Sequence, residues 1–170
     1  MLERDTEFKV GEVAVYPGHG VGRIESIEER EFCGQRQAFY ILRILDTDMT
    51  IMVPVNGART AGLRCIIDQK DVERIYEILK EEPVIHDNIP WNRRYKEYME
   101  KIKSGSLYDV AFVLRELYCL RSLKELSFGE KKMFEMAKNL LKKELAFALN
   151  LEEEKVERKI EELFSRNKKA

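Results

Sequence analysis

The sequence predicts an α+β protein, with a small SH3-like or Tudor-like β-barrel at the N-terminus followed by an all-helical domain. Two observations support this. Up to about residue 55 the chain is rich in β-branched and aromatic residues punctuated by Gly and Pro, whereas from residue 91 onward Leu, Lys, Glu, Met and Ala dominate and no Pro occurs. The apolar residues also change their spacing, from short extended runs to stripes of helical period. The 170 residues suffice for two small domains.

Four or five short extended runs make up the predicted barrel. A run at residues 13–16 ends in the turn PGHG, and a long alternating stretch covers residues 21–32. Residues 38–45, AFYILRIL, are almost continuously apolar, which is typical of a central strand. The next run, TIMVPV at residues 50–55, contains Pro54, which has no N–H to donate to a neighbouring strand. We therefore expect this strand at an edge of the sheet.

A helix is predicted directly after the strands. Asp68 is suited to cap its N-terminus. Its apolar face consists of Val72, Ile75, Tyr76 and Leu79. Residues 81–90 then contain two prolines and no periodicity, which indicates a linker. We accordingly assign residues 1–82, barrel and helix together, to the N-terminal domain and residues 91–170 to the helical domain.

Four more helices are predicted between residues 91 and 164. Ser106 marks one helix start, and Ser127 with Glu130 three positions later is typical of a capping box. The helix that begins at Trp91 carries its apolar stripe on Tyr95, Tyr98, Met99 and Ile102. Such stripes indicate a packed helical core rather than a cofactor site.

Composition and charge exclude several classes of protein. No apolar run has the length of a membrane span and the N-terminus is too charged for a secretory signal, so we expect a cytoplasmic protein. Cys33, Cys65 and Cys119 lack metal-ligand spacing and are interpreted as buried thiols. The net charge is −6 over residues 1–90 but +5 over residues 91–150. A polyanion would bind the second segment more readily, although so mild an excess also fits a solvated helical surface.

No motif indicates catalysis. The glycines of GHGVG at residues 18–22 could suggest a phosphate loop, but this segment continues into a predicted strand, which favours a simple turn. Walker A, HExxH, GxSxG and spaced zinc-ligand patterns are all missing from the sequence. We expect no enzymatic activity, no small-molecule substrate, no metal and no cofactor.

The segment WNRRYK at residues 91–96 combines the chain's one tryptophan with three cations. In one interpretation Trp91 packs between linker and helix while Arg93, Arg94 and Lys96 are solvated. In the other, the cations hold phosphates and the ring enters the minor groove or stacks at a disrupted base step. The residue types alone leave both interpretations open.

Several separated motifs resemble the CarD/CdnL family of bacterial transcription regulators. They are FKVGEVAVYPGHGVGRI, GQRQAFYILRIL, TIMVPV, WNRRYKEYMEKIKSGS and LSFGEKKM. Their order is that of the family, and the resemblance runs from about Phe8 to at least Leu149. The CdnL-like branch is the closer match, because the chain has no basic, AT-hook-like tail.

The resemblance implies a polymerase-bound transcription factor. Its N-terminal domain would bind the lobe of the RNA polymerase β subunit, and its helical domain would contact promoter DNA at the upstream edge of the melted bubble. Trp91 would be the minor-groove wedge that stabilises the open complex. Its DNA-binding companions would be Arg93, Arg94, Lys96, Lys131 and Lys132. The polymerase-binding residues would be Arg30, Met52, Val53 and Pro54.

Further expectations follow from this resemblance. Some relatives carry a basic residue at position 52, so the Met52 found here favours an apolar or main-chain contact over an ion pair. A monomer is expected, associated with the nucleoid through polymerase. DNA contacts should not be sequence-specific, because no helix presents a set of Asn, Gln and Arg suited to reading base edges.

Two other functions stay open. A general nucleic-acid-binding SH3-like module would bind nucleic acid without polymerase, which the mild positive excess disfavours. A pure protein–protein adaptor would bury Trp91 and make DNA irrelevant.

Overall fold

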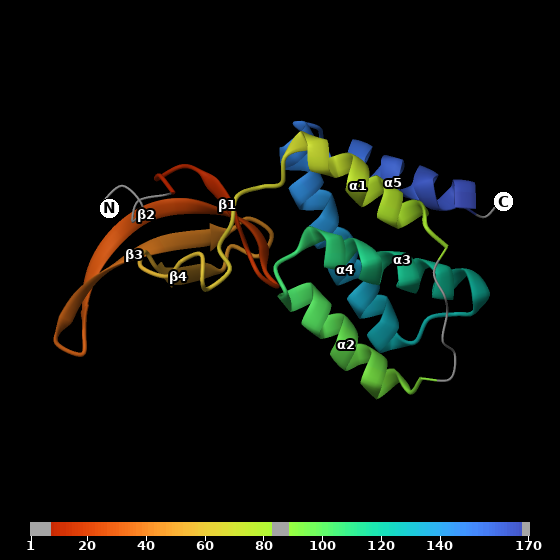
Figure 1. Ribbon diagram of the computed structural model, residues 1–170, viewed down its shortest axis with the longest axis horizontal. Helices are drawn as coiled ribbons and strands as arrows, with labels where there is room; N and C mark the ends of the chain where they lie inside the picture. Colours follow the sequence, from red (N-terminus) through yellow and green to blue (C-terminus); the bar gives the residue numbers. More distant parts are fainter. Residues whose placement is uncertain (1–7, 83–88, 168–170) are drawn as a thin grey trace. The chain divides into compact units, whose positions relative to one another are not determined.

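The computed structural model describes residues 8–82 and 89–167. The chain divides into two compact units, Met1–Ile66 and Ile67–Ala170. A sheet forms the first unit and five helices form the second (Figure 1). The predicted fold class, α+β with a β module ahead of a helical domain, is confirmed.

The N-terminal unit is a four-stranded antiparallel sheet in which each strand pairs with the next along the chain. Its strands are β1 (Val13–Tyr16), β2 (Gly20–Phe32), β3 (Gln35–Ile44) and β4 (Thr50–Pro54). A β-bulge between Ile24 and Ser26 bends β2, and the sheet curls into a half-barrel of the predicted Tudor-like kind (Figure 1). The core of this unit consists of Phe8, Ala14, Ile24, Tyr40, Leu42, Ile44, Val53, Ala58 and Leu63.

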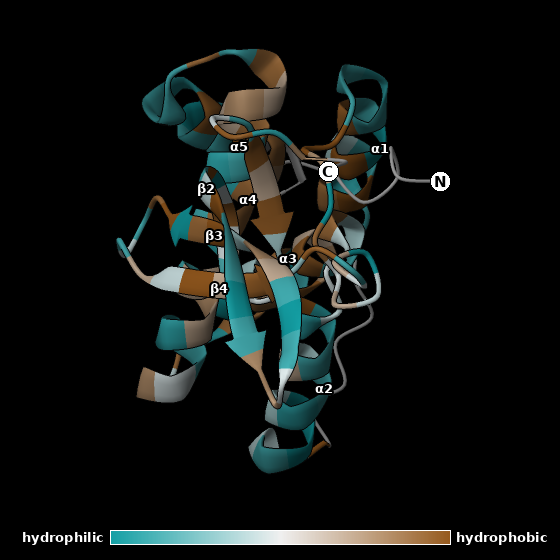
Figure 2. Cartoon of the chain, turned by 90° about the vertical axis from the view of Figure 1, so that its left-hand side faces the viewer, coloured by the Kyte–Doolittle hydropathy of each residue, from teal (hydrophilic) through white to brown (hydrophobic). Residues whose placement is uncertain are grey.

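The β2–β3 hairpin extends beyond this core. Its turn consists of Cys33 and Gly34, with φ of 54° and 79°, the type I′ geometry that matches the twist of the strands. Residues 29–37 are exposed, and Figure 2 shows the end of the hairpin as mainly hydrophilic. The expected burial of the cysteines is therefore wrong for Cys33 and for Cys65, because a turn and a loop leave both side chains exposed. Cys119 is partly buried, and this burial raises the pKa of its thiol.

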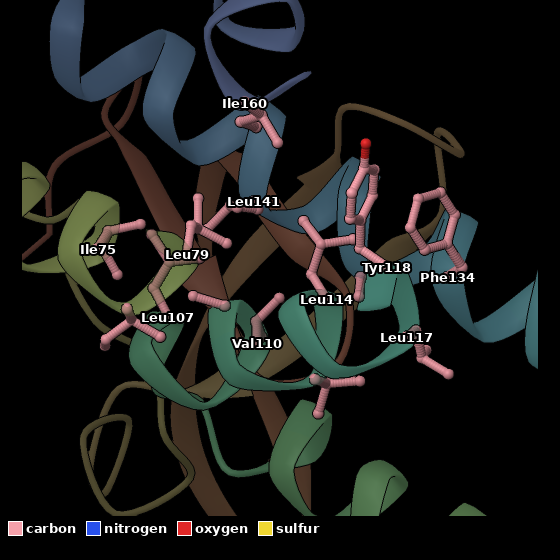
Figure 3. Packing of buried hydrophobic residues seen from close by; sticks show 14 of the residues in the cluster. Ile75, Leu79, Leu107, Val110, Leu114, Leu117, Tyr118, Phe134, Leu141 and Ile160 are labelled. Atoms are coloured by element: carbon pink, nitrogen blue, oxygen red, sulfur yellow. The ribbon is translucent and has the colours of Figure 1, made fainter. Parts of the chain in front are cut away.

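The helical unit consists of α1 (Gln69–Lys80), α2 (Trp91–Lys103), α3 (Leu107–Leu123), α4 (Phe128–Leu149) and α5 (Glu153–Asn167). Helix α3 packs against α1, α2 and α4 and is buried on several sides. Figure 3 shows side chains of α1, α3, α4 and α5 that meet in one core. They include Ile75, Leu79, Leu114, Leu141 and Ile160.

Helix α1 packs with the helical unit. The sequence predicts that it belongs with the barrel in residues 1–82, but Val72, Ile75 and Leu79 are buried in the helical core, and α1 packs against α3 and α5. An apolar stripe is visible in the sequence, whereas the surface that covers it depends on how the helices assemble. Of the predicted linker at 81–90, residues 83–88 lie outside the described residues.

The predicted capping box of Ser127 and Glu130 is present at the start of α4. The Ser127 hydroxyl accepts a hydrogen bond from the Glu130 N–H at 3.3 Å, and the Glu130 carboxylate accepts one from the Ser127 N–H at 2.9 Å. Asp68 and Ser106 also occupy N-cap positions, but neither side chain makes a capping hydrogen bond. Residue type thus predicts where a helix begins, while the bond itself depends on how the chain enters the helix.

Candidate nucleic-acid interface and partner-binding edge

Trp91 is the first residue of α2 and is partly buried at the margin of the helical core. Its ring meets Tyr95 edge-on with centroids 5.8 Å apart and Tyr98 at 6.4 Å. A Cβ atom at Gly129 would lie 3.2 Å from the indole Nε1, closer than ordinary contact, so the ring rests on the first turn of α4. The tryptophan therefore packs against α4 and still keeps part of its surface open, and its burial alone does not select one interpretation.

The three predicted cations of α2 have different surroundings. The Arg93 side chain is 75% exposed, with Glu97 3.9 Å away, and Lys96 is exposed. The Arg94 side chain is only 16% exposed. Its Nε donates to the Ile89 carbonyl at 3.3 Å, and its guanidinium lies 5.3 Å from the centre of the Trp91 ring. Arg93 and Lys96 are thus accessible to a phosphate, whereas Arg94 is engaged within the protein.

Lys131 and Lys132, both exposed, follow the residues that Trp91 and Arg94 touch on α4. Lys131 has Glu125 as a partner at 3.6 Å. Since Trp91 rests on Gly129, the folded chain brings the segments WNRRYK and GEKKM to the same end of the helical unit. The two groups of predicted DNA contacts are therefore neighbours, although Lys131 lies 35 positions after Lys96 in the sequence.

Two exposed rings at this end of the unit were missed by sequence reasoning. Phe128, the first residue of α4, is 83% exposed. Tyr95, predicted to point inward, is 46% exposed, because the core face of α2 centres on the buried Tyr98 and Ile102. Phe128 could have been noticed, since it lies outside the apolar stripe of α4 in a segment that already stood out.

The start of α2 has an unusual charge distribution. Its N-cap is Pro90, which has no capping side chain, and no acidic residue lies in its first turn. The N–H groups of Arg93 and Arg94 donate to the Pro90 carbonyl. The positive end of a helix dipole thus coincides with arginine side chains, an arrangement that is unfavourable by itself and that favours a nearby anion.

Glu130 supplies the anion that the start of α2 lacks. Its side chain is 2% exposed, and one carboxylate oxygen lies 3.5 Å from the Arg94 guanidinium. The other oxygen accepts from the Ser127 N–H and lies 3.4 Å from the Lys124 ammonium. Burial by itself would raise the pKa of this carboxyl, but the hydrogen bonds of Ser127 and the charge of Lys124 outweigh burial and hold the pKa below its usual value.

Strand β4 lies at an edge of the sheet, as predicted from Pro54. The Val55 N–H donates to the Ala38 carbonyl, and the register pairs Val53 with Tyr40 and Met52 with Ile41. In an antiparallel ladder hydrogen-bonded pairs alternate with non-bonded pairs. Val53 therefore directs its main-chain groups toward β3, whereas Thr50, Met52 and Pro54 direct theirs away from the sheet.

Three of the four predicted polymerase contacts share one face of the sheet. Opposite residues of paired strands lie on the same face, so the register places Met52, Pro54 and Arg30 on the face opposite the core. Met52 is 43% exposed, and Arg30, exposed on the hairpin, pairs with Glu28 at 2.9 Å. Val53 differs, because its side chain is 1% exposed in the core and its main chain pairs with β3. Val53 therefore holds β4 in the sheet and does not itself face a partner.

The described residues form neither a metal-ligand cluster nor a membrane-spanning helix. Within residues 8–82 and 89–167, no group of three or more His, Cys, Asp or Glu side chains could hold a metal ion. None of the described helices combines the length and hydropathy of a membrane span.

Comparison with known proteins assigns both units. Residues 8–67 match the family described as the CarD-like/TRCF RID domain, and residues 74–161 match the CarD C-terminal domain. YdeB of Bacillus subtilis strain 168, itself named only as a candidate transcription factor, is 34% identical over 153 residues, which cover 88% of this chain and 97% of YdeB. A solved structure of CdnLNt from Myxococcus xanthus is 55% identical, covers 38% of this chain and 90% of its own, and has a TM-score of 0.32.

The two family matches and the YdeB match extend over both units and agree with the motifs found in the sequence. The chain therefore belongs to the CarD/CdnL family of transcription factors.

Proposed function

We propose that this protein binds the lobe of the RNA polymerase β subunit through strand β4 and stabilises the promoter open complex through sequence-nonspecific DNA contacts of its helical unit. The observation that carries the proposal is that the two units present two different kinds of binding surface. In the N-terminal unit, β4 pairs on one side only among the described residues, and the helical unit presents a tryptophan with exposed cations at the positive end of a helix.

Strand addition is the contact that the β4 edge supports best. The outward groups of Thr50, Met52 and Pro54 offer two N–H donors and three carbonyl acceptors to a partner strand. Met52 adds an exposed apolar side chain on one face of that edge. The match of this unit to the CarD-like/TRCF RID domain supports a polymerase subunit as the partner.

On DNA, the partly exposed Trp91 ring would insert where base steps are already unstacked. Insertion into closed duplex would first require unstacking of a base step, which costs about a few kcal/mol. Arg93, Lys96, Lys131 and Lys132 would hold the phosphates beside it. A contact that exists only with open DNA shifts the equilibrium toward the open state. About 1.4 kcal/mol of such difference changes the open-to-closed ratio tenfold, and binding to polymerase supplies the local concentration that a weak contact needs.

Two measurements on one set of variants test the proposal. Binding to a β-lobe fragment should be lost in Met52→Glu and retained in Trp91→Ala. Open-complex lifetime, measured with saturating protein, should be shortened by Trp91→Ala. Circular dichroism shows whether each variant is folded.

A gel-shift assay with and without polymerase, added to these measurements, separates the two rival functions. Nucleic-acid binding of similar strength with and without polymerase would support a general nucleic-acid-binding module instead. A Trp91→Ala protein with unaltered open-complex lifetime and a lowered melting temperature would support a pure protein–protein adaptor.

A further inference from the structure

Arg94 differs from the other cations near Trp91 because its guanidinium is already committed. It donates to the Ile89 carbonyl at 3.3 Å, lies 3.5 Å from a Glu130 oxygen and stands 5.3 Å from the centre of the Trp91 ring. That Glu130 oxygen is buried and has no other hydrogen-bond partner among the described residues. If Arg94 moved to reach a phosphate, this buried oxygen would lose its charged neighbour, because Lys124 and the Ser127 N–H meet the other oxygen, and the loss would be unfavourable.

Gly129 completes the surroundings of the ring. A Cβ atom at this position would lie 3.2 Å from the indole Nε1 and 3.5 Å from Cζ2. The nitrogen edge of the indole therefore rests on the backbone of α4, while Arg94 lies against its face. We call Arg94, Gly129 and Glu130 the indole seat.

We propose that the indole seat holds Trp91 in the orientation in which it meets DNA, with Arg94 as a positioning residue that makes no phosphate contact itself. Glu130 acts through Arg94 while its capping box holds the start of α4 in place. Phosphates are left to cations such as Arg93, whose side chain is 75% exposed. The DNA part of this inference rests on the proposed function, whereas the seat itself is a property of the free protein.

Because Trp91 is the chain's one tryptophan, intrinsic fluorescence reports on this ring alone. The first experiment measures the emission maximum and acrylamide quenching of the free, full-length protein. Arg94→Gln should red-shift the emission and make quenching faster, and Gly129→Ala should displace the ring with no change of charge. Ala forms helix better than Gly, so a change in Gly129→Ala comes from the added methyl group. Glu130→Gln, which can keep the capping box, should change the spectrum in the same direction as Arg94→Gln.

Arg93→Gln is the matched control, since it removes the same charge one position away. Its emission and quenching should equal those of the wild type, and its effect on open-complex lifetime should fade as salt rises, because phosphate contacts are screened. Arg94→Gln should shorten that lifetime about fivefold, which corresponds to about 1 kcal/mol, at low and high salt alike.

The outcomes are distinct. Unchanged indole fluorescence in both Arg94→Gln and Gly129→Ala would overturn the seat, as would an Arg94→Gln defect that salt abolishes as it does for Arg93→Gln. If Arg94→Gln does not fold, the fluorescence of Gly129→Ala decides. Failure of the proposed function would look different, because Trp91→Ala would then leave the open-complex lifetime unchanged while the fluorescence results on the free protein still stood.

Discussion

Replacing Met52 by proline separates main-chain strand pairing from side-chain docking at the β4 edge. The register directs the Met52 N–H away from β3, so proline at this position removes an outward donor and no hydrogen bond of the existing ladder. Met52→Ala is the control, because it removes the same side chain and keeps the N–H. With Met52 43% exposed, both variants should fold, and Met52→Ala should change the free energy of unfolding by no more than about 0.5 kcal/mol.

The magnitude follows from the hydrogen bond that the partner strand would lose. A carbonyl group left unpaired in the interface costs about 1–3 kcal/mol. Met52→Pro should therefore bind a β-lobe fragment roughly 5- to 150-fold more weakly than Met52→Ala. Titration calorimetry or surface plasmon resonance with the purified fragment measures this ratio directly.

Ile51→Pro checks which residues of β4 direct their N–H groups toward β3. Ile51 pairs with Leu42 and directs its N–H toward β3, so proline there should destabilise the N-terminal unit itself. If Met52→Pro and Met52→Ala bound the fragment equally well, strand addition through the Met52 N–H would be refuted, and the contact would have to be made by side chains.

Three further predictions concern the helical unit. Trp91→Ala should lower the free energy of unfolding by about 2 kcal/mol in thermal circular dichroism, because a fully buried tryptophan typically costs 3–5 kcal/mol, roughly, and this ring is only partly buried. A loss of 4 kcal/mol or more, on the order of a core residue, would contradict that estimate. The lowered pKa of Glu130 means that its ionised form stabilises the fold at pH values above the ordinary carboxyl pKa of about 4 and that this contribution is lost as the pH falls through the folded-state pKa. The melting temperature of the wild type should therefore exceed that of Glu130→Gln at neutral pH, and the difference should shrink as the pH falls through the folded-state pKa of Glu130; a constant difference would speak against this role. The isolated protein should bind linear duplex DNA weakly and without sequence preference in gel-shift assays at physiological salt. Tight, sequence-selective binding would contradict the proposal that its DNA contacts are nonspecific and depend on binding to polymerase.

Local signals in the sequence determined the fold class, the position of one edge strand and the start of one helix. Proline has no N–H, so Pro54 restricts its strand to an edge wherever the rest of the sheet lies. The capping box of Ser127 and Glu130 closes within four residues, so it can be recognised without knowing the neighbours of the helix. The change from short extended runs to helical stripes likewise predicted the α+β class. WNRRYK and GEKKM were identified as a pair by family resemblance.

The tertiary structure decided which surfaces these elements share. Periodicity shows that α1 has an apolar face but not that α3 and α5 cover it, which is why the helix was grouped with the barrel. Helical spacing places Arg94, four residues before the buried Tyr98, on the core face of α2, but it does not show which side chain Arg94 meets there. Only the packing of α4 against α2 places Glu130 beside Arg94 and the Gly129 backbone beside Trp91. Burial and long-range ion pairs arise from contacts between segments far apart in the chain, and a single sequence does not specify those contacts.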